Sequence, residues 1–459
     1  MSVWLLALTL IGIILAAWWY YTRRLDWQFA HITAQLNKIT NKRQVKAAAG
    51  KRILSRIYKI INTSLHAGRT ADAYRAFDSL KLALGHGLGR PGESVRLTAA
   101  VYLAVKSNQL DIAGHGIDAF RPLLKNMKPG EVPAAVEQLA LIAVLSLKKR
   151  QNFLAARAVE VIAAGMGAAA DEADRAAAMR ALRLIGVFAL RRQDTGLVLE
   201  LQRKLETWLT AVPSTVSSQE QVAGILSSWL HRIVKTGDAS QLAILTQYID
   251  QLVKKGLLTE QAITIIIAEC NYLAGMDSRN PYSRLTGAIS MANLELAVQM
   301  RTVSIWRQAV DGAGQAARLA IAQRTLTECF AVGYPLFEMG RRLLIAELNA
   351  GPLQDNFRQQ ALYVLVRECL QLIEFVGRQN FAVTAADIIE QIYLDWIKRQ
   401  GNAGHNKSIK KFCQLLFLYC TRIKRRQKRA TADGADFNTG EGITAADREQ
   451  LKRLGFISE

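Results

Sequence analysis

The apolar residues of the chain recur mostly at helical spacing. Leu242, Leu245, Ile249 and Leu252 are separated by three, four and three positions, which places them on one face of a helix. The apolar positions of residues 197–208 repeat this spacing. A dense alternation of β-branched or aromatic residues with polar ones is absent, so strands are poorly supported. The pattern predicts an all-α protein whose helices each bury one face.

Five stretches share a longer pattern, in which an apolar helix, a short polar turn and a second apolar helix follow one another. Their turns fall at Gly68, Asn108, Arg150, Gln193 and Gly237, at successive spacings of 40, 42, 43 and 44 residues. Stacked two-helix repeats produce such a period. We therefore predict an α-solenoid of helical hairpins over residues 55–400, less regular over residues 260–360, with a sixth hairpin at residues 375–392.

This arrangement resembles the α-solenoid class, which includes HEAT-like and TPR-like helical repeats. The period exceeds the 34 residues of the TPR family. The layout is also similar to that of membrane-anchored bacterial assembly factors with cytoplasmic TPR domains. Some of those proteins carry a C-terminal C-x-x-C metal ribbon, which this chain lacks. The resemblance implies a scaffold that binds protein partners, and it transfers no functional residue to this chain.

The N-terminal segment predicts a transmembrane helix over residues 1–22. It contains no charged side chain, and residues 3–21 form an apolar run close to the length of about 20 residues that crosses a bilayer. A cleaved signal peptide would need a basic residue before the apolar run and small residues at its end. The predicted anchor residues are aromatic at the two ends of the run and basic after it: Trp4, Trp18, Trp19, Tyr20, Tyr21, Arg23 and Arg24.

Residues 23–54 are predicted to be a basic stalk helix. Between residues 23 and 59 the chain has ten Lys or Arg and one acid, Asp26. By the positive-inside rule we expect a single-pass protein of the cell (inner) membrane with its C-terminal body in the cytoplasm. The apolar stripe at Phe29, Ile32, Leu36 and Ile39 fits either a dimeric coiled coil or a stalk that is solvated or packed on the solenoid.

A second basic region explains most of the remaining net charge of +21. Residues 398–430 hold eleven Lys or Arg and no acid. Within the predicted segment 401–430, the apolar stretch 412–420 is expected to cap the last repeat. Residues 431–459 are predicted to be a linker and a short amphipathic helix. Three interpretations of the basic run stay open: it binds anionic lipid, it binds nucleic acid, or it is a tail that contacts only solvent. Its residues are Arg422, Lys424, Arg425, Arg426, Lys428 and Arg429.

Local signatures of catalysis or metal binding are absent from the sequence. No two of the five cysteines have C-x-x-C spacing, and no His belongs to an H-E-x-x-H motif. The glycines of residues 85–92 fit a helix C-terminus better than a nucleotide-binding loop. We therefore expect no catalytic residue, metal or cofactor, and a scaffold for protein partners at the membrane. The alternatives are a peripheral binder of anionic lipid or nucleic acid through residues 23–60 and 398–430, and an enzyme of unrecognised type.

Overall fold

The computed structural model describes most of the N-terminal two thirds of the chain. The described residues are 3–40, 47–89, 92–128, 130–165, 171–211, 216–278 and 285–321, with positions 339, 357, 360, 361, 364, 365, 367 and 368. They form fifteen helices and no strand, which confirms the all-α prediction for this part of the chain. The chain divides into two compact units, Met1–Pro213 and Ser214–Glu459.

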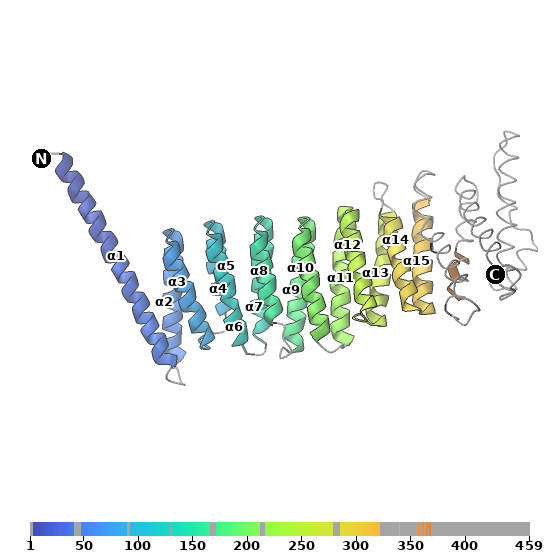
Figure 1. Ribbon diagram of the computed structural model, residues 1–459, viewed down its shortest axis with the longest axis horizontal. Coiled ribbons are helices and arrows are strands. Elements are labelled where there is room, and N and C mark those ends of the chain that lie inside the picture. The colour runs from blue at the N-terminus through green and yellow to red at the C-terminus, as the bar shows by residue number, and fades with distance from the viewer. Residues whose placement is uncertain are drawn as a thin grey trace, which may run out of the picture. The chain divides into compact units, whose positions relative to one another are not determined.

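Unit 1 contains ten of these helices, and eight of them are arranged in two layers (Figure 1). In one layer α2, α4, α7 and α9 contact one another in that order, and in the other α3, α5, α8 and α10 do the same. The short α6 lies beside α3, α5 and α8. The bounds are α1 Val3–Thr40, α2 Ala47–His66, α3 Thr70–Gly85, α4 Glu93–Lys106, α5 Leu110–Asp118, α6 Phe120–Lys125, α7 Val132–Lys148, α8 Asn152–Gly165, α9 Glu172–Arg191 and α10 Thr195–Ala211.

The described helices of unit 2 alternate in the same way. Helices α11, α13 and α15 contact one another in order and form one layer. Helices α12 and α14 contact each other in the second layer. The bounds are α11 Val216–Thr236, α12 Ala239–Lys254, α13 Glu260–Ser278, α14 Thr286–Met300 and α15 Val303–Ile321. The predicted sixth hairpin, the basic region 398–430 and the C-terminal segment 431–459 lie outside the described residues.

The five predicted turns are confirmed, because each turn residue has a left-handed backbone. Asn108 has φ 56°, and Arg150 and Gln193 have φ of 60° and 57°. The Asn108 N–H donates to the carbonyl of Val105 (3.3 Å), and the next N–H donates to that of Ala104 (2.9 Å). This bonding satisfies the last carbonyls of a helix and ends it. The turn residues thus stop the first helix of each hairpin.

The core between the layers follows the repeat. The eighth residue after each turn residue is buried in all five hairpins; these residues are Ala76, Gly116, Ala158, Leu201 and Leu245. At Gly116 a Cβ atom would lie 2.8 Å from the Val101 side chain and 3.0 Å from the Phe77 ring, so only glycine fits. The predicted stripe of residues 242–252 is buried on α12, which confirms its assignment to the core.

The apolar stripe of α1 packs within its own chain. Phe29, Ile32 and Leu36 are buried, and α1 contacts α3. The Arg75 guanidinium of α3 lies 3.0 Å from the Asp26 carboxylate and 5.8 Å from the centroid of the Phe29 ring. These contacts agree with the packed-stalk interpretation. The predicted stalk, residues 23–54, comprises the end of α1 and the start of α2.

The predicted membrane anchor gains no support from the helix properties. Within the residues that the structure describes, no helix is both long and apolar enough to cross a membrane. Although α1 begins at Val3, the side chains of residues 3–9 lie outside the described part. The anchor therefore stays a prediction.

Candidate partner-binding groove

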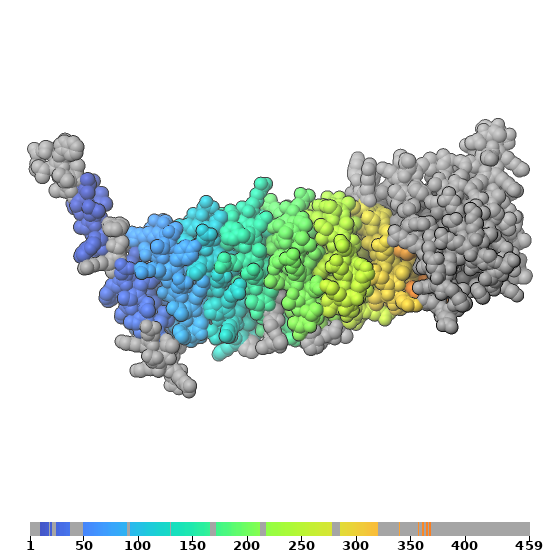
Figure 2. All heavy atoms as spheres, viewed as in Figure 1, coloured from blue at the N-terminus to red at the C-terminus, as the bar shows by residue number. Residues whose placement is uncertain are grey.

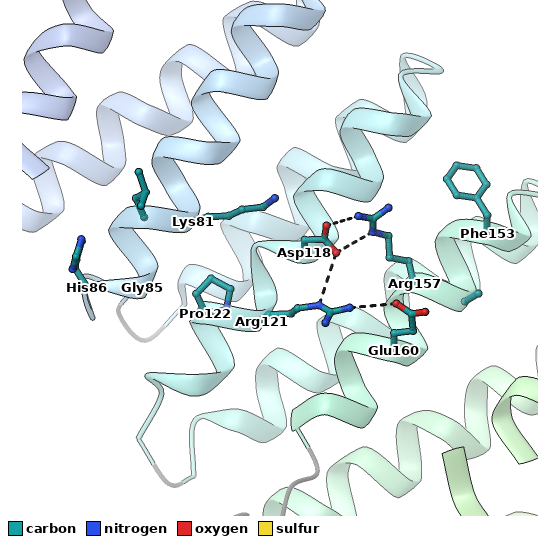
Figure 3. A pocket seen from close by; sticks show the side chains of 11 residues that line it. Lys81, Gly85, His86, Asp118, Arg121, Pro122, Phe153, Arg157 and Glu160 are labelled. Carbon is teal, nitrogen blue, oxygen red and sulfur yellow. Dashed lines mark hydrogen bonds and ion pairs between the residues drawn. The ribbon is translucent and has the colours of Figure 1, made fainter. Parts of the chain in front are cut away.

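The second layer of unit 1 has a groove of about 860 Å³ between α3, α5, α6 and α8 (Figure 3). Polar, charged and apolar side chains share its walls. The lining residues are Lys81, Leu82, Gly85, His86, Asp118, Arg121, Pro122, Phe153, Ala156, Arg157 and Glu160.

A set of ion pairs joins three of these helices across the groove. The Arg157 guanidinium donates to both oxygens of Asp118, with its Nε atom 2.9 Å from Oδ1. Arg121 lies between two acids, since its Nε is 3.9 Å from Asp118 Oδ1 and its Nη2 is 3.2 Å from Glu160 Oε2. Figure 3 shows the four side chains as one connected cluster. Asp118 ends α5, while Arg121 comes from α6 and the other two come from α8.

The preceding repeat carries a similar contact. His115 Nε2 lies 2.7 Å from the Asp78 carboxylate, and its Nδ1 lies 3.0 Å from the Lys81 ammonium. The Lys81 ammonium also lies 3.1 Å from Nε2, so it contacts both ring nitrogens. The Tyr74 ring packs edge-on against the imidazole at 5.2 Å. His115 therefore links α3 to α5, as Arg157 links α5 to α8.

These contacts follow the repeat, and we call them the charge ladder. In the first three hairpins, an Arg or His stands seven residues after the turn residue, and an Asp or Glu stands ten residues after it. The ladder residues are Arg75, His115 and Arg157 at the first position, and Asp78, Asp118 and Glu160 at the second. The acid of one repeat pairs with the base of the next in Asp78–His115 and Asp118–Arg157. In α10 the order is reversed, with Glu200 and Arg203.

The cluster keeps the Asp118 side chain ionised. Burial alone would raise its pKa, but the hydrogen bond and charge of Arg157, with the charges of Lys81 and Arg121, lower the pKa overall. The hydrogen bond to Asp118 in turn raises the pKa of Arg157. Burial lowers the pKa of Lys81, although nearby acids oppose this effect. The groove thus has a fixed pattern of alternating charge.

Exposed apolar side chains flank this charged cluster. Leu82 on α3 is 56% exposed and Phe153 on α8 is 47% exposed. Large apolar groups beside ordered guanidinium groups are typical of protein-binding surfaces. A segment of another protein could therefore cover these side chains and accept hydrogen bonds from the guanidinium groups.

A second cavity, of about 640 Å³, lies in unit 2 between α12, α13 and α14. It reaches Cys270, whose thiol is buried. Burial, with a smaller contribution from the Glu269 charge, raises the pKa of this thiol to about 12. A protonated thiol is a poor nucleophile, so Cys270 has no feature of a catalytic cysteine. Across the described residues no group of three or more His, Cys, Asp or Glu is placed to hold a metal ion.

Few of the predicted site residues can be placed. Trp19, Tyr20 and Arg24 lie on α1 and are exposed. The side chains of Trp4, Trp18, Tyr21 and Arg23 lie outside the described residues, as does the whole basic run. That run comprises Arg422, Lys424, Arg425, Arg426, Lys428 and Arg429. The groove residues were not predicted, although the charges seven and ten positions after the first three turns were a usable signal.

Comparisons with known proteins assign no family. No protein-family model matches the chain, and no curated protein matches it. Among solved structures the chain is similar to a circular tandem repeat protein with novel repeat topology and enhanced subunit contact surfaces. The identity is 15%, the TM-score is 0.31, and the match covers 89% of this chain and 98% of that one. At these values the similarity carries no functional argument, and the helical-repeat description rests on the helix contacts given above.

Proposed function

We propose that this protein is a scaffold that binds a segment of a partner protein at the cytoplasmic face of a membrane. The groove of unit 1 carries the proposal. It combines two exposed apolar side chains, Leu82 and Phe153, with guanidinium groups that the charge ladder holds in place. Side chains that are already ordered lose little entropy on binding, so such a surface favours association. The proposed activity is binding and not catalysis.

The partner segment is proposed to carry apolar side chains and at least one acidic group. Leu82 and Phe153 offer apolar area, and the charged lining comprises three cations, Lys81, Arg121 and Arg157, against two acids. A carboxylate of the partner would accept hydrogen bonds from guanidinium donors that are not aimed at Asp118 or Glu160. Charge-assisted bonds of this kind are stronger than neutral ones.

The exposure of α1 supports the membrane location. Leu10, Ile13 and Leu15 are 59%, 67% and 58% exposed. The other exposed apolar residues of this segment are Ile11, Ile14, Trp19 and Tyr20. At 100° per residue these positions surround the helix, so none of the residues that the structure describes covers any face of it. In Figure 2 the described atoms of this segment stand apart from α2 and α3. A helix that is apolar on all sides requires an apolar environment, which a bilayer provides.

Alkaline extraction of membranes tests the anchor. The full chain should stay with the membrane pellet, and a variant with Ile11→Lys, Ile14→Lys and Leu15→Lys should be released, because charges are costly at the bilayer centre. A reporter fused after Glu459 should be active in the cytoplasm. Release of the unmodified chain by alkali would refute the anchor, and activity of the reporter on the opposite side would refute the orientation.

Two matched substitutions test the groove. Phe153→Glu adds a charge on α8 in the groove, and Leu141→Glu adds the same charge at an apolar residue of α7 that is 54% exposed and outside the groove. Both sites are exposed, so neither change should unfold unit 1. The first variant should lose partners that co-purify with the full chain in detergent, and the second should keep them. Equal retention by both variants would remove the groove from the proposal.

A further inference from the structure

Unit 1 contains another cavity, of about 530 Å³, between α1 and α2. Its walls are polar and basic, and none of the lining residues is acidic. The residues from α1 are Arg24, Leu25, Trp27, Gln28, His31 and Ile32, and those from α2 are Arg56, Lys59, Ile60 and Thr63.

The three cations of this cavity, Arg24, Arg56 and Lys59, differ from the paired arginines of α3, α6 and α8. Arg75, Arg121 and Arg157 are each paired with an acid. Within the described part of the chain, the side chains of Arg24, Arg56 and Lys59 form no ion pair. Arg24, Arg56 and Lys59 are all exposed, so solvent weakens but does not remove the repulsion among these three like charges. A bound anion would relieve this repulsion.

The other lining groups complete a site with one aromatic wall. The Trp27 ring stacks on the His31 ring, with centroids 5.3 Å apart and an interplanar angle of 9°. His31 Nε2 lies 2.9 Å from the Gln35 amide, and the Thr63 hydroxyl donates to the backbone carbonyl of Lys59 at 2.7 Å. Trp27 is 66% exposed, and tryptophan is one of the residues enriched at membrane–water interfaces.

The position of the cavity identifies the source of the anion. Arg24 follows Tyr20 by four residues of the same helix, which is about 6 Å along the axis. If the apolar segment of α1 enters a bilayer, the cavity lies at the level of the lipid headgroups. Guanidinium groups bind phosphate oxygens in a bidentate manner. We propose that this cavity binds the phosphate headgroup of one anionic phospholipid. The inference rests on the proposed membrane anchor, and it assigns a specific lipid site to that anchor.

Native mass spectrometry of the full chain in detergent tests the site. The probe lipid is phosphatidylglycerol, with phosphatidylcholine as the neutral-headgroup comparison. The double variant Arg56→Gln, Lys59→Gln removes two cavity cations. The matched control Lys51→Gln, Arg52→Gln removes two exposed cations of α2 that do not line the cavity. Both variants change the net charge equally, so diffuse attraction to anionic lipid would weaken to the same extent in both.

We expect the cavity variant to bind phosphatidylglycerol at least about tenfold more weakly, since charge-assisted hydrogen bonds are lost, and the control to change by less than about twofold. Equal weakening in both variants would overturn the proposal. Displacement of the lipid by an equal concentration of inorganic phosphate would indicate a free-phosphate site, and displacement by an oligonucleotide would indicate nucleic acid; either result would overturn it. Circular dichroism of each variant confirms that the helices are intact.

The lipid measurement and the alkaline extraction distinguish failure of the lipid site from failure of the anchor. Lipid binding is measured in detergent, so it does not require the apolar segment to span a bilayer. If the chain resists alkaline extraction but binds no phosphatidylglycerol, the anchor is supported and the lipid site is refuted. A chain that alkali releases would lose the anchor, and the lipid inference would then fall with it whatever the detergent result.

Discussion

Two arginine–carboxylate pairs, one in each unit, have the same chemistry and opposite protonation behaviour. In unit 1 the Asp118 side chain is 19% exposed and its partner Arg157 is 43% exposed. In unit 2 the Glu368 side chain is 3% exposed and its partner Arg318 is 29% exposed. The pKa of Asp118 is lowered, whereas the pKa of Glu368 is raised.

The difference comes from the number of charges around each carboxylate. Burial raises both pKa values and is the largest single effect in each case. Around Asp118, the hydrogen bond and charge of Arg157 act together with Lys81 and Arg121, and their sum exceeds the effect of burial. Around Glu368, burial and the Asp311 charge raise the pKa, and they outweigh the lowering effects of Arg318 and Arg367.

The comparison shows that an ion pair in a helical repeat can serve two purposes. The pair in unit 1 belongs to the charge ladder at the edge of an open groove, where charge remains available to a partner. The pair in unit 2 is a packing contact. Gly314 of α15 makes room for it, since a Cβ atom there would collide with the Glu368 carboxylate. We therefore expect changes in unit 2 to act on stability and changes in the ladder to act mainly on binding.

The largest expected effect comes from charges in the cores. Leu201→Asp in unit 1 and Leu245→Asp in unit 2 each place a carboxylate at an equivalent buried position of the repeat. Each should destabilise its unit by about 4 kcal/mol or more, because an unpaired buried charge is costly. Hydrogen exchange with mass spectrometry should show faster exchange across α7–α10 in the first variant and across α11–α14 in the second. Normal protection in either variant would mean that this position is not in the core.

Gly314→Ala should have the next largest effect. The added methyl group would displace the Glu368 carboxylate from Arg318, and we expect a loss of about 2–4 kcal/mol in the free energy of unfolding. Gly224→Ala in α11 is the control, because nothing lies within 4 Å of a Cβ atom at that position. It should be neutral or stabilising by up to about 1 kcal/mol. Urea denaturation measures both, and equal effects would contradict the close packing around Glu368.

Arg318→Gln should cost about 2 kcal/mol at pH 8, because the Glu368 carboxylate is left buried without its cation. The cost should shrink on acidification. Since the folded-state pKa of Glu368 is raised, its contribution to stability is complete below its ordinary pKa of 4.5 and is lost as the pH rises through the folded value. Urea denaturation at pH 5 and pH 8 tests this, and a cost that grows toward low pH would show that the direction is wrong.

Arg157→Gln should have the smallest effect, below about 1 kcal/mol, because the pair is partly exposed and screened by solvent. Its cost should also shrink on acidification, because a protonated Asp118 no longer attracts the Arg157 charge. The lowered folded-state pKa of Asp118 gives stability that is present above its ordinary pKa of 3.8 and is lost as the pH falls through the folded value. The variant should therefore differ from the parent at pH 6 and converge with it near pH 2 in urea denaturation. A cost as large as that of Arg318→Gln would remove the contrast between the two pairs.

Much of the fold could be predicted because it depends on local patterns. Helical spacing identified the buried stripe of α12, and turn chemistry located left-handed residues such as Asn108 and Gln193. The groove was not predicted, because it depends on side chains about forty residues apart, such as Asp118 and Arg157. Local motifs do not contain such pairs. Aligning the repeats on their turn residues would have brought the acids and bases of the charge ladder into register.

Photo-crosslinking in intact cells tests the central claim most directly, which is that the groove of unit 1 binds a partner. A benzoylphenylalanine replaces Phe153 in one full-length protein and Leu141 in another, so that one probe lies in the groove and the other on the opposite layer. We expect one dominant protein adduct from position 153, found in the membrane fraction, and none from position 141. The adduct from position 153 should also diminish when Arg121 is changed to Gln. Equal labelling from both positions, or no adduct from position 153 in membranes, would contradict the account.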